Sequence, residues 1–441
     1  MKKIIIILIL FPLLMWSQEP PTSFTLTEAV NYALQNAYTI KNADDDIATA
    51  KKKVWETTTM GLPQINAKVD YQNFIKQPVS LIPAQFFGGP PGEFAEVSFG
   101  TKQNMKASAT LSQLIFNGSY LVGLQSSRVY LKISESIKTK TKTLVKEGVT
   151  NAYAGVLLIK ESIRILEKNK SILEKNLSDT KQIVQNGFAE EQDAEQLQLT
   201  LSKITNQLQN MQSLYTYNLN MLKYAMGIPI ANEIKLSQNL DDLALNDDLT
   251  LTQTPFDYSQ HIDYQISENS VKANKLLIKL EQSKALPSLV AFINYGLTAY
   301  GEEFQFFNKD QKWFDNSILG VSLNVPIFSS LKRSVRVQQA KIGLEKAERA
   351  KEETAEKLKL AYQTALLNYN NAVKNYQTAK ESLALAQRIE KKEAVKFFEG
   401  VSGSFQLSSA QNQLYTHQQQ YLQAIFDLIS KKAALETALN K

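Results

Sequence analysis

Four stretches of this chain alternate apolar and polar residues with the period of two that a β-strand requires. In the first stretch, Ile65, Ala67, Val69 and Tyr71 alternate with polar residues. The pattern predicts strands at about 62–75, 102–116, 286–300 and 314–328. Strands of roughly ten residues with one apolar and one polar face suit a membrane β-barrel, with lipid outside and water inside. The alternative is a soluble sandwich with one buried face.

Long helical stretches follow each pair of strands. Apolar residues recur in steps of three and four from Ala152 to Val184, with Lys170 and Thr180 in two of the positions, and again without a gap from Leu358 to Ala386. This is the heptad spacing of a coiled coil. Neither 119–185 nor 329–399 contains proline, so each predicts a helix of roughly 100 Å. Helical periodicity resumes after a glycine turn in both halves. The pattern therefore predicts two helical hairpins whose helices are longer than those of a typical globular domain.

The same order of elements occurs twice along the chain. LPQINAKVDYQNF from Leu62 aligns with LPSLVAFINYGLT from Leu286, and IFNGS from Ile115 aligns with IFSSL from Ile327. A helix opens each half, and a T-x-x-E capping box at Thr25 begins the first one. We interpret 18–227 as a first repeat with its hairpin tip near 187, 228–256 as a linker, and 257–441 as a second repeat with its tip near 400.

The N-terminus and the composition narrow the class of protein. Residues 1–17 resemble a secretory signal peptide, because Lys2 and Lys3 precede an apolar run that is too short to span a membrane. The chain has no cysteine, so disulfides and a lipid anchor on cysteine are excluded, and we expect it not to be lipidated. Its net charge of +6 is mild, and alternating Lys and Glu indicate solvated helix faces rather than a nucleic-acid surface.

No motif of the chain points to catalysis. The two histidines, His261 and His417, lie far apart and without partner motifs. No zinc-protease, nucleotide-binding or nucleophile-elbow pattern occurs. We therefore expect no enzyme activity and no cofactor.

Four strands cannot close a membrane barrel, since the smallest such barrels have about eight. An open sheet edge in lipid would leave backbone groups unsatisfied. We therefore expect chains to share one barrel, and three chains would give a lumen wide enough for water. We expect the lumen face of this barrel to be polar, with Gln64, Asn66, Ser108 and Asn324 on it. We also expect an interfacial aromatic girdle of Tyr71, Phe74, Tyr295, Tyr300, Trp313 and Phe314. The segments Lys76 to Gly100 and Gly301 to Lys312 are expected to be external loops.

Taken in order, these marks resemble the TolC family of outer-membrane efflux proteins. The segments that carry the resemblance are FTLTEAVNYALQNAYTI, the paired Leu-Pro strand starts, the IFNGS and PIFSS turns, NGFAEEQDAEQLQL, and FEGVSGSFQLSSAQNQLYTHQQQ. The resemblance implies a mainly α chain with a membrane β-barrel. Each chain would give four strands to a trimeric 12-stranded barrel set on a periplasmic α-barrel.

The resemblance also implies a function and partners. The chain would be an outer-membrane channel subunit extending into the periplasm, and the passive exit duct of a tripartite efflux pump or a type I secretion system. Its partners would be two further copies, a periplasmic adaptor (membrane fusion) protein, an inner-membrane transporter of RND or ABC type, and outer-membrane lipid, with no nucleic acid. The rival interpretations are a periplasmic coiled-coil adaptor and a structural coiled-coil spacer, neither of which requires four amphipathic strands.

The same resemblance points to the hairpin tips as the candidate site. The residues expected to dock the adaptor are Asn186, Gly187, Phe188, Gly400, Val401, Ser402 and Gly403. Asp193 stands at the place of a tube-narrowing Asp of the family, whereas the second half has Gln406 there and Phe397 where the family often has Tyr. We hypothesise that Asp193, Glu390, Glu393 and Glu399 set cation sensitivity near the tip; the alternative is that they are solvated helix ends.

Overall fold

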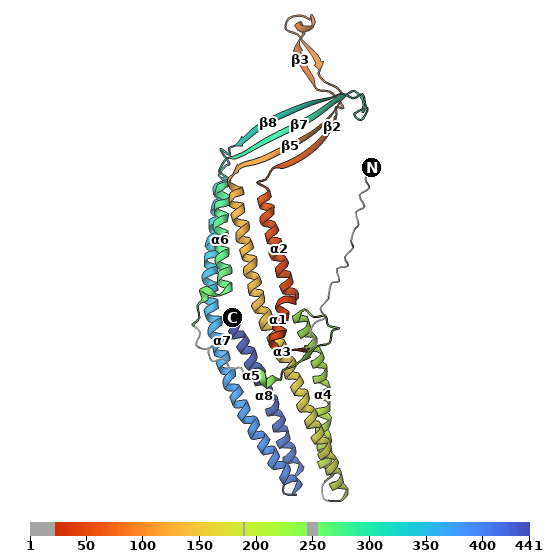
Figure 1. Ribbon diagram of the computed structural model, residues 1–441, viewed down its shortest axis with the longest axis vertical. Coiled ribbons are helices and arrows are strands. Elements are labelled where there is room, and N and C mark those ends of the chain that lie inside the picture. Colours follow the sequence, from red (N-terminus) through yellow and green to blue (C-terminus); the bar gives the residue numbers. More distant parts are fainter. Residues whose placement is uncertain (1–22, 188–189, 245–254) are drawn as a thin grey trace, which may run out of the picture. The chain divides into compact units, whose positions relative to one another are not determined.

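The structure is a computed structural model that describes residues 23–187, 190–244 and 255–441 (Figure 1). The expected signal peptide, Phe188 and part of the expected linker lie outside the described residues. In chain order, the elements of the first half are β1 (Ser23–Phe24), α1 (Leu26–Asn36), α2 (Tyr38–Thr59), β2 (Gln64–Asn73), β3 (Val79–Pro83), η1 (Ala84–Phe87), β4 (Phe94–Ser98), β5 (Gln103–Asn117), α3 (Gly118–Gln185) and α4 (Glu191–Met226).

The remaining elements repeat much of this order. They are β6 (Lys235–Leu236), α5 (Leu240–Ala244), η3 (Tyr258–Gln260), α6 (Ile262–Ser283), β7 (Ser288–Gly301), β8 (Trp313–Asn324), α7 (Lys332–Phe398) and α8 (Ser404–Ala438). α3 and α7 contain 68 and 67 residues, so the expected long helices are present. The expected fold class is confirmed: a mainly helical chain that carries four principal strands in one open sheet. The division into consecutive repeats stays an interpretation of the sequence.

The opening helix is broken where one continuous helix was expected. Its start is as predicted, because Thr25 and Glu28 form a complete capping box. At Ala37, however, ψ is 137°, which ends α1 before α2 begins. The break lies against a residue far along the chain: Gly227, with φ of +77°, is so close that a Cβ on it would stand 2.3 Å from the carbonyl oxygen of Asn36. The close approach requires glycine at 227.

The principal sheet is antiparallel, with the strand order β2-β5-β7-β8 (Figure 1). β2 and β8 are its edges, and β5 pairs with β7 across the two halves of the sequence. The pairing of β5 with β7 contains one irregularity between Leu114 and Phe116. Four strands with two edges form an open sheet within one chain, as expected.

The segment between β2 and β5 corrects one expectation. It was predicted as a loop, but β3 and β4 pair antiparallel in a separate two-stranded sheet, with Val79 opposite Ser98 and Pro83 opposite Phe94. The several Pro and Gly residues of the segment hid these short strands. Exposed aromatic side chains, including Phe86, Phe87 and Phe94, lie on this hairpin or on η1.

The described residues divide into two compact units: one within 23–44, 137–263 and 355–441, and one of residues 45–136 and 264–354. The first unit contains a core in which Tyr153 is fully buried. The hydroxyl of Tyr153 donates to the carbonyl oxygen of Phe24 at 2.9 Å, and burial raises the pKa of this phenol to about 12. Phe24 belongs to β1, which pairs parallel with β6. The core thus ties the first described strand to α3 and to the segment that follows α4.

A histidine caps the start of α6 in the same unit. His261 is 8% exposed, and its Nδ1 accepts a hydrogen bond from the backbone N–H of Asp263 at 3.1 Å. Only the neutral ring can accept at Nδ1. Burial lowers the pKa of His261, against a smaller opposing effect of the Asp263 carboxylate. The folded unit therefore favours the uncharged imidazole.

Candidate channel wall and helical tips

One face of the four-stranded sheet is apolar along most of each strand. Cross-strand partners place Ala109 between Ala67 and Tyr295, and Leu111 between Ile65 and Ile293. The stripe continues into β8, where Ile293 faces Leu319. Little of the chain covers this face: Leu319 is 77% exposed and Ile65 is 75% exposed. A large exposed apolar surface marks contact with lipid or another protein.

The opposite face is largely polar, as expected, but not throughout. In β2 and β5 it presents Gln64, Asn66, Lys68, Thr110 and Ser108, which occupy alternate positions in paired strands. Asn294 of β7 extends this face, since its side-chain amide donates to the Thr110 hydroxyl at 2.6 Å. Lys68 pairs with Asp70 at 2.8 Å. This half of the sheet can face water.

β7 and β8 add aromatic and aliphatic groups to that polar face. Phe292 lies over Gly320, where a Cβ would stand 2.5 Å from its ring. Ile318 is the partner of Asn294 and so lies on the same face. The polar positions of β8 expected from alternation therefore share their face with apolar side chains. The Phe292 ring fits on this face because Gly320, the residue that it covers, has no side chain.

The expected aromatic girdle divides between the two faces. Trp313 belongs to the apolar face and packs with the buried Phe306 and with Met105. Tyr71 meets the Phe306 ring edge-on, with 5.9 Å between centroids. Tyr300 and Phe314 lie on the polar face, with ring centroids 6.1 Å apart. Alternation predicts this division, because neighbouring residues of one strand point to opposite faces.

Both hairpin tips turn on a glycine in the left-handed region. Gly187 has φ of +76° and its N–H donates to the carbonyl oxygen of Val184 at 2.9 Å. Gly400 has φ of +74° and its N–H donates to the carbonyl oxygen of Phe397 at 3.1 Å. The matching geometry ends α3 and α7 alike. It leaves Asn186 and Gly187 exposed at one tip, and Gly400, Val401 and Gly403 at the other, while Ser402 is half-buried.

The two tips are joined by a hydrogen bond from Ser404 to Asp193. The hydroxyl of Ser404, the first residue of α8, donates to the carboxylate of Asp193 in the first turn of α4. Ser404 is 5% exposed. The structure therefore gives Asp193 a partner that the sequence did not reveal. Gln406 takes no part in that contact and lies near the start of α8, where its side-chain oxygen approaches Gly403.

The other candidate gate residues lie along the end of α7. Glu393 binds Lys396 at 2.8 Å, and this ammonium holds the pKa of Glu393 below its ordinary value. Phe397 packs edge-on against Phe398, with 5.5 Å between centroids. Glu399 is exposed and Glu390 is half-buried. These carboxylates lie near the turn but in a separate group from the bond between Asp193 and Ser404.

Buried amides line the seam between α3 and α8, and the sequence analysis missed them. Asn169 is 3% exposed and donates to the side-chain oxygen of Gln418 at 3.1 Å. Seven residues nearer the tip on each helix, Asn176 and Gln411 are also buried. Within the described residues, neither amide atom of Gln411 makes a hydrogen bond. Asparagine and glutamine at heptad spacing were the available signal.

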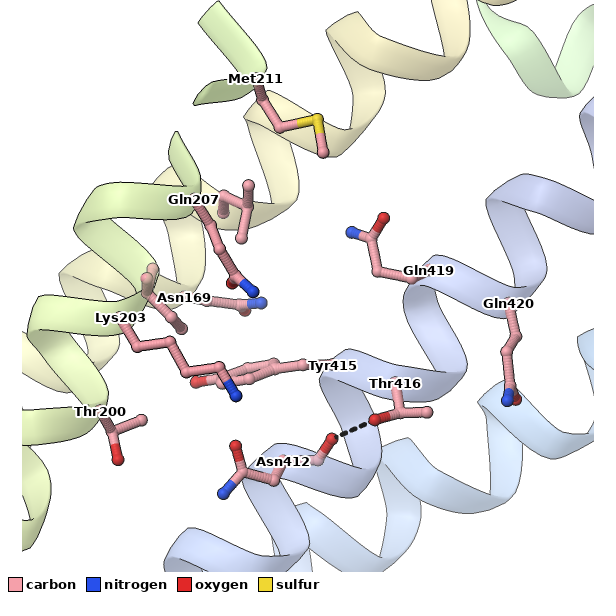
Figure 2. Close-up of a pocket in the computed structure, with 12 residues that line it drawn as sticks. Asn169, Thr200, Lys203, Gln207, Met211, Asn412, Tyr415, Thr416, Gln419 and Gln420 are labelled. Carbon is pink, nitrogen blue, oxygen red and sulfur yellow. Dashed lines mark hydrogen bonds between the residues drawn. The ribbon is translucent and has the colours of Figure 1, made fainter. Parts of the chain in front are cut away.

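A cavity of about 600 Å³ opens beside this seam (Figure 2). α3, α4 and α8 line it, and Lys203, Gln207, Tyr415 and Gln419 are among its polar side chains. Burial raises the pKa of Tyr415, so its hydroxyl stays protonated. The cavity shows that the two hairpins pack through polar as well as apolar layers.

In the described ranges, no helix contains an apolar window long enough to cross a membrane. No group of three or more His, Cys, Asp or Glu side chains there is placed to hold a metal ion.

Solved structures of outer-membrane channels have the same fold as this chain. The Campylobacter jejuni CmeC outer membrane channel matches with a TM-score of 0.73 and 16% identity, over 94% of this chain and 85% of that one. The outer membrane protein VceC of Vibrio cholerae matches with a TM-score of 0.69 and 13% identity, over 94% and 96%. The MtrE outer membrane channel of Neisseria gonorrhoeae matches with a TM-score of 0.70 and 15% identity, over 94% and 88%.

These likenesses define the class of fold, a TolC-like chain that carries part of a barrel sheet and two long helical hairpins. A sequence model described as "Outer membrane efflux protein" matches residues 262–441. No curated protein sequence matches the chain. The family match is thus confined to the second half of the chain, and the fold of the described residues is the one expected from the resemblance to the TolC family.

Proposed function

We propose that this protein is one of three identical subunits of an outer-membrane channel. The observation that carries the proposal is the open four-stranded sheet, with an exposed apolar face, an opposite polar face and two unpaired edges. Water cannot satisfy an exposed sheet edge inside a bilayer. Three copies supply twelve strands, and closure of this sheet would turn the apolar face to lipid and the polar face to a lumen. The channel is a passive conduit, since we assign it no catalytic group.

The hairpin tips are the part of this channel that we propose docks a periplasmic adaptor. The exposed residues of the two glycine turns, Gly187 and Gly400, present backbone and small side chains without obstruction. An adaptor bound there would connect the duct to an inner-membrane transporter of RND or ABC type, in an efflux pump or a type I secretion system. The family, the paired glycine tips and the long helices support this assignment.

Asp193 and Ser404 have a proposed role in holding the tips closed. Their hydrogen bond joins the starts of α4 and α8, so its loss would free one hairpin tip from the other. We expect Asp193→Asn and Ser404→Ala each to raise single-channel open probability, and the double variant to match the singles. Glu191→Gln is the control, because it changes an exposed carboxylate in the same first turn of α4 that lies outside this contact. Additive effects in the double variant would contradict a shared contact.

The orientation of the sheet is tested by the surroundings of its two faces. The chain has no cysteine, so a spin label can be placed at one position at a time. A label at Val69→Cys should be relaxed by lipid-soluble oxygen, and a label at Lys68→Cys by a water-soluble nickel chelate. These neighbours point to opposite faces. Equal exposure of both labels to the chelate would mean that the sheet does not face lipid.

A further inference from the structure

The turn between β8 and α7 exposes large apolar side chains. Ile327 is 89% exposed, Phe328 is 82% exposed and Leu331 is 73% exposed. β8 itself has 12 residues, about the length that a strand needs to cross a bilayer. In the proposed channel the apolar face of β8 lies in lipid, so this turn lies at a boundary of the bilayer.

The backbone of this turn is fixed in an uncommon shape. Ser330 has φ of +46° and Leu331 has φ of +62°, a region that residues other than glycine rarely adopt. No other pair of adjacent non-glycine residues among those described has positive φ. The guanidinium of Arg333 donates to the Ser329 hydroxyl at 2.9 Å and to two backbone carbonyl oxygens of the turn. The exposed apolar side chains therefore belong to a turn of defined shape.

The first turns of α7 add positive charge beside these apolar side chains. Lys332 and Arg336 are both exposed, and a separation of four residues places them on one face of the helix. Within the described ranges, neither side chain has a carboxylate partner. The sequence has no Asp or Glu between Asp315 and Glu345. The described part of the chain therefore supplies no counter-ion for these two charges.

Lysines near two other helix ends next to the sheet are paired. Lys53 of α2 binds Glu56 at 2.8 Å, and Lys284, just after α6, binds Glu281 at 2.6 Å. Both α2 and α6 lead directly into strands of the sheet. The unpaired charges thus distinguish the start of α7 from the ends of α2 and α6.

We propose that the start of α7 and the turn before it bind anionic lipid at its phosphate headgroup. The residues of this surface, the α7 anchor, are Ile327, Phe328, Leu331, Lys332 and Arg336. The proposal rests on the proposed channel and locates one boundary of its bilayer.

Charge and position both favour lipid as the occupant of the α7 anchor. Its apolar side chains continue the apolar face of β8 and enter the edge of the acyl region, which is how interfacial surfaces bind a membrane. Basic residues next to a bilayer attract anionic lipid. The guanidinium of Arg336 can offer two parallel N–H donors to one phosphate, and the ammonium of Lys332 adds a second charge.

A fluorophore at the turn tests its contact with lipid. The chain has no cysteine, so a bimane label at Leu331→Cys is the only one in the protein. The protein from outer membranes is reconstituted into vesicles of phosphatidylcholine and phosphatidylglycerol, in which some acyl chains carry a nitroxide near the headgroup. The nitroxide should quench this label strongly. A label at Ile342→Cys, also exposed but about 16 Å further along α7, should be quenched little.

The same label at Leu331→Cys measures which lipid the α7 anchor prefers. Nitroxide-labelled phosphatidylglycerol should quench it at a lower lipid fraction than nitroxide-labelled phosphatidylcholine. Lys332→Gln with Arg336→Gln should lower this preference roughly five-fold for each charge removed, whereas Lys332→Arg with Arg336→Lys should keep it. The matched control is Lys346→Gln with Arg349→Gln. It removes the same two charges about 20 Å further along α7, beyond the screening length of about 10 Å at 0.1 M salt.

A label at Val69→Cys, on the apolar face of β2, separates failure of the α7 anchor from failure of the channel. Quenching at Val69 without quenching at Leu331 overturns the anchor and leaves the channel standing, because another chain or water then covers the turn. An unchanged preference in Lys332→Gln with Arg336→Gln, or an equal loss in its control, overturns the binding of anionic lipid there. No quenching at either labelled position overturns both proposals.

Discussion

A single charge placed on either side of β8 should have very different costs. Leu319 and Ile318 are neighbours near the middle of the strand, with Leu319 on the apolar face and Ile318 on the polar face. Arginine facing lipid near the bilayer midplane costs about 2–4 kcal/mol. At Ile318, which is 53% exposed, arginine loses only part of an isoleucine's burial, about 1 kcal/mol. Leu319→Arg should therefore cost about 1–3 kcal/mol more than Ile318→Arg.

That difference corresponds to roughly a 5- to 140-fold change in the unfolding equilibrium. It can be measured by denaturant unfolding of each variant in lipid bilayers, followed by tryptophan fluorescence. The two variants have the same new side chain and nearly the same lost volume, so each controls for the other. An equal loss in both variants, or a greater loss in Ile318→Arg, would refute the assignment of the apolar face to lipid.

Three further predictions concern the helical part of the chain. Gly227→Ala should lower the thermal midpoint, since the left-handed φ alone costs on the order of 1–2 kcal/mol and the new Cβ meets the Asn36 carbonyl oxygen; Gly148→Ala, where nothing lies within 4 Å, should raise it or leave it unchanged. His261 has a pKa lowered by burial, so the unfolded chain binds more protons and stability should fall as pH drops below about 6.5. His261→Asn should flatten that slope in pH-dependent thermal unfolding, and an unchanged slope would exclude His261 as its source. Asn169→Leu should cost about 0.5–1.5 kcal/mol, the net contribution of one hydrogen bond, by removing the donor to the half-buried Gln418 amide. Asn169→Leu with Gln418→Leu should recover most of the loss in chemical unfolding, and a double variant as unstable as the single would contradict the pairing.

The sheet could be predicted from sequence because alternation is a local signal. In 64–73, the polarity of each residue indicates the face on which it lies. The cross-strand partners agree with that pattern across four strands. The strand order was not available, since the pairing of β5 with β7 joins residues almost two hundred positions apart. Phe292 on the polar face was equally hidden, because it depends on Gly320 in a neighbouring strand.

In the helices, too, contacts between residues far apart in sequence could not be predicted. Heptad spacing predicted α3 and α7, but it gave no sign of the break at Ala37 or of the close approach of Gly227 to it. At the tips, the turns could be predicted because glycine commonly ends a helix in the left-handed conformation, and Gly187 and Gly400 do adopt it. The partner of Asp193 could not, because Ser404 reaches it only once two hairpins lie together. Buried amides such as Gln411 were missed because polar residues in a helix usually indicate its solvated face.

The number of chains in one particle tests the central claim most directly. The unheated protein would be extracted from outer-membrane fractions in detergent, and its protein mass measured by light scattering corrected for bound detergent. The shared barrel predicts three chains of 49.6 kDa each, less any segment removed on export. A single chain per particle, or release of the protein without detergent, would contradict the account, because the open sheet would then have neither a partner nor a bilayer.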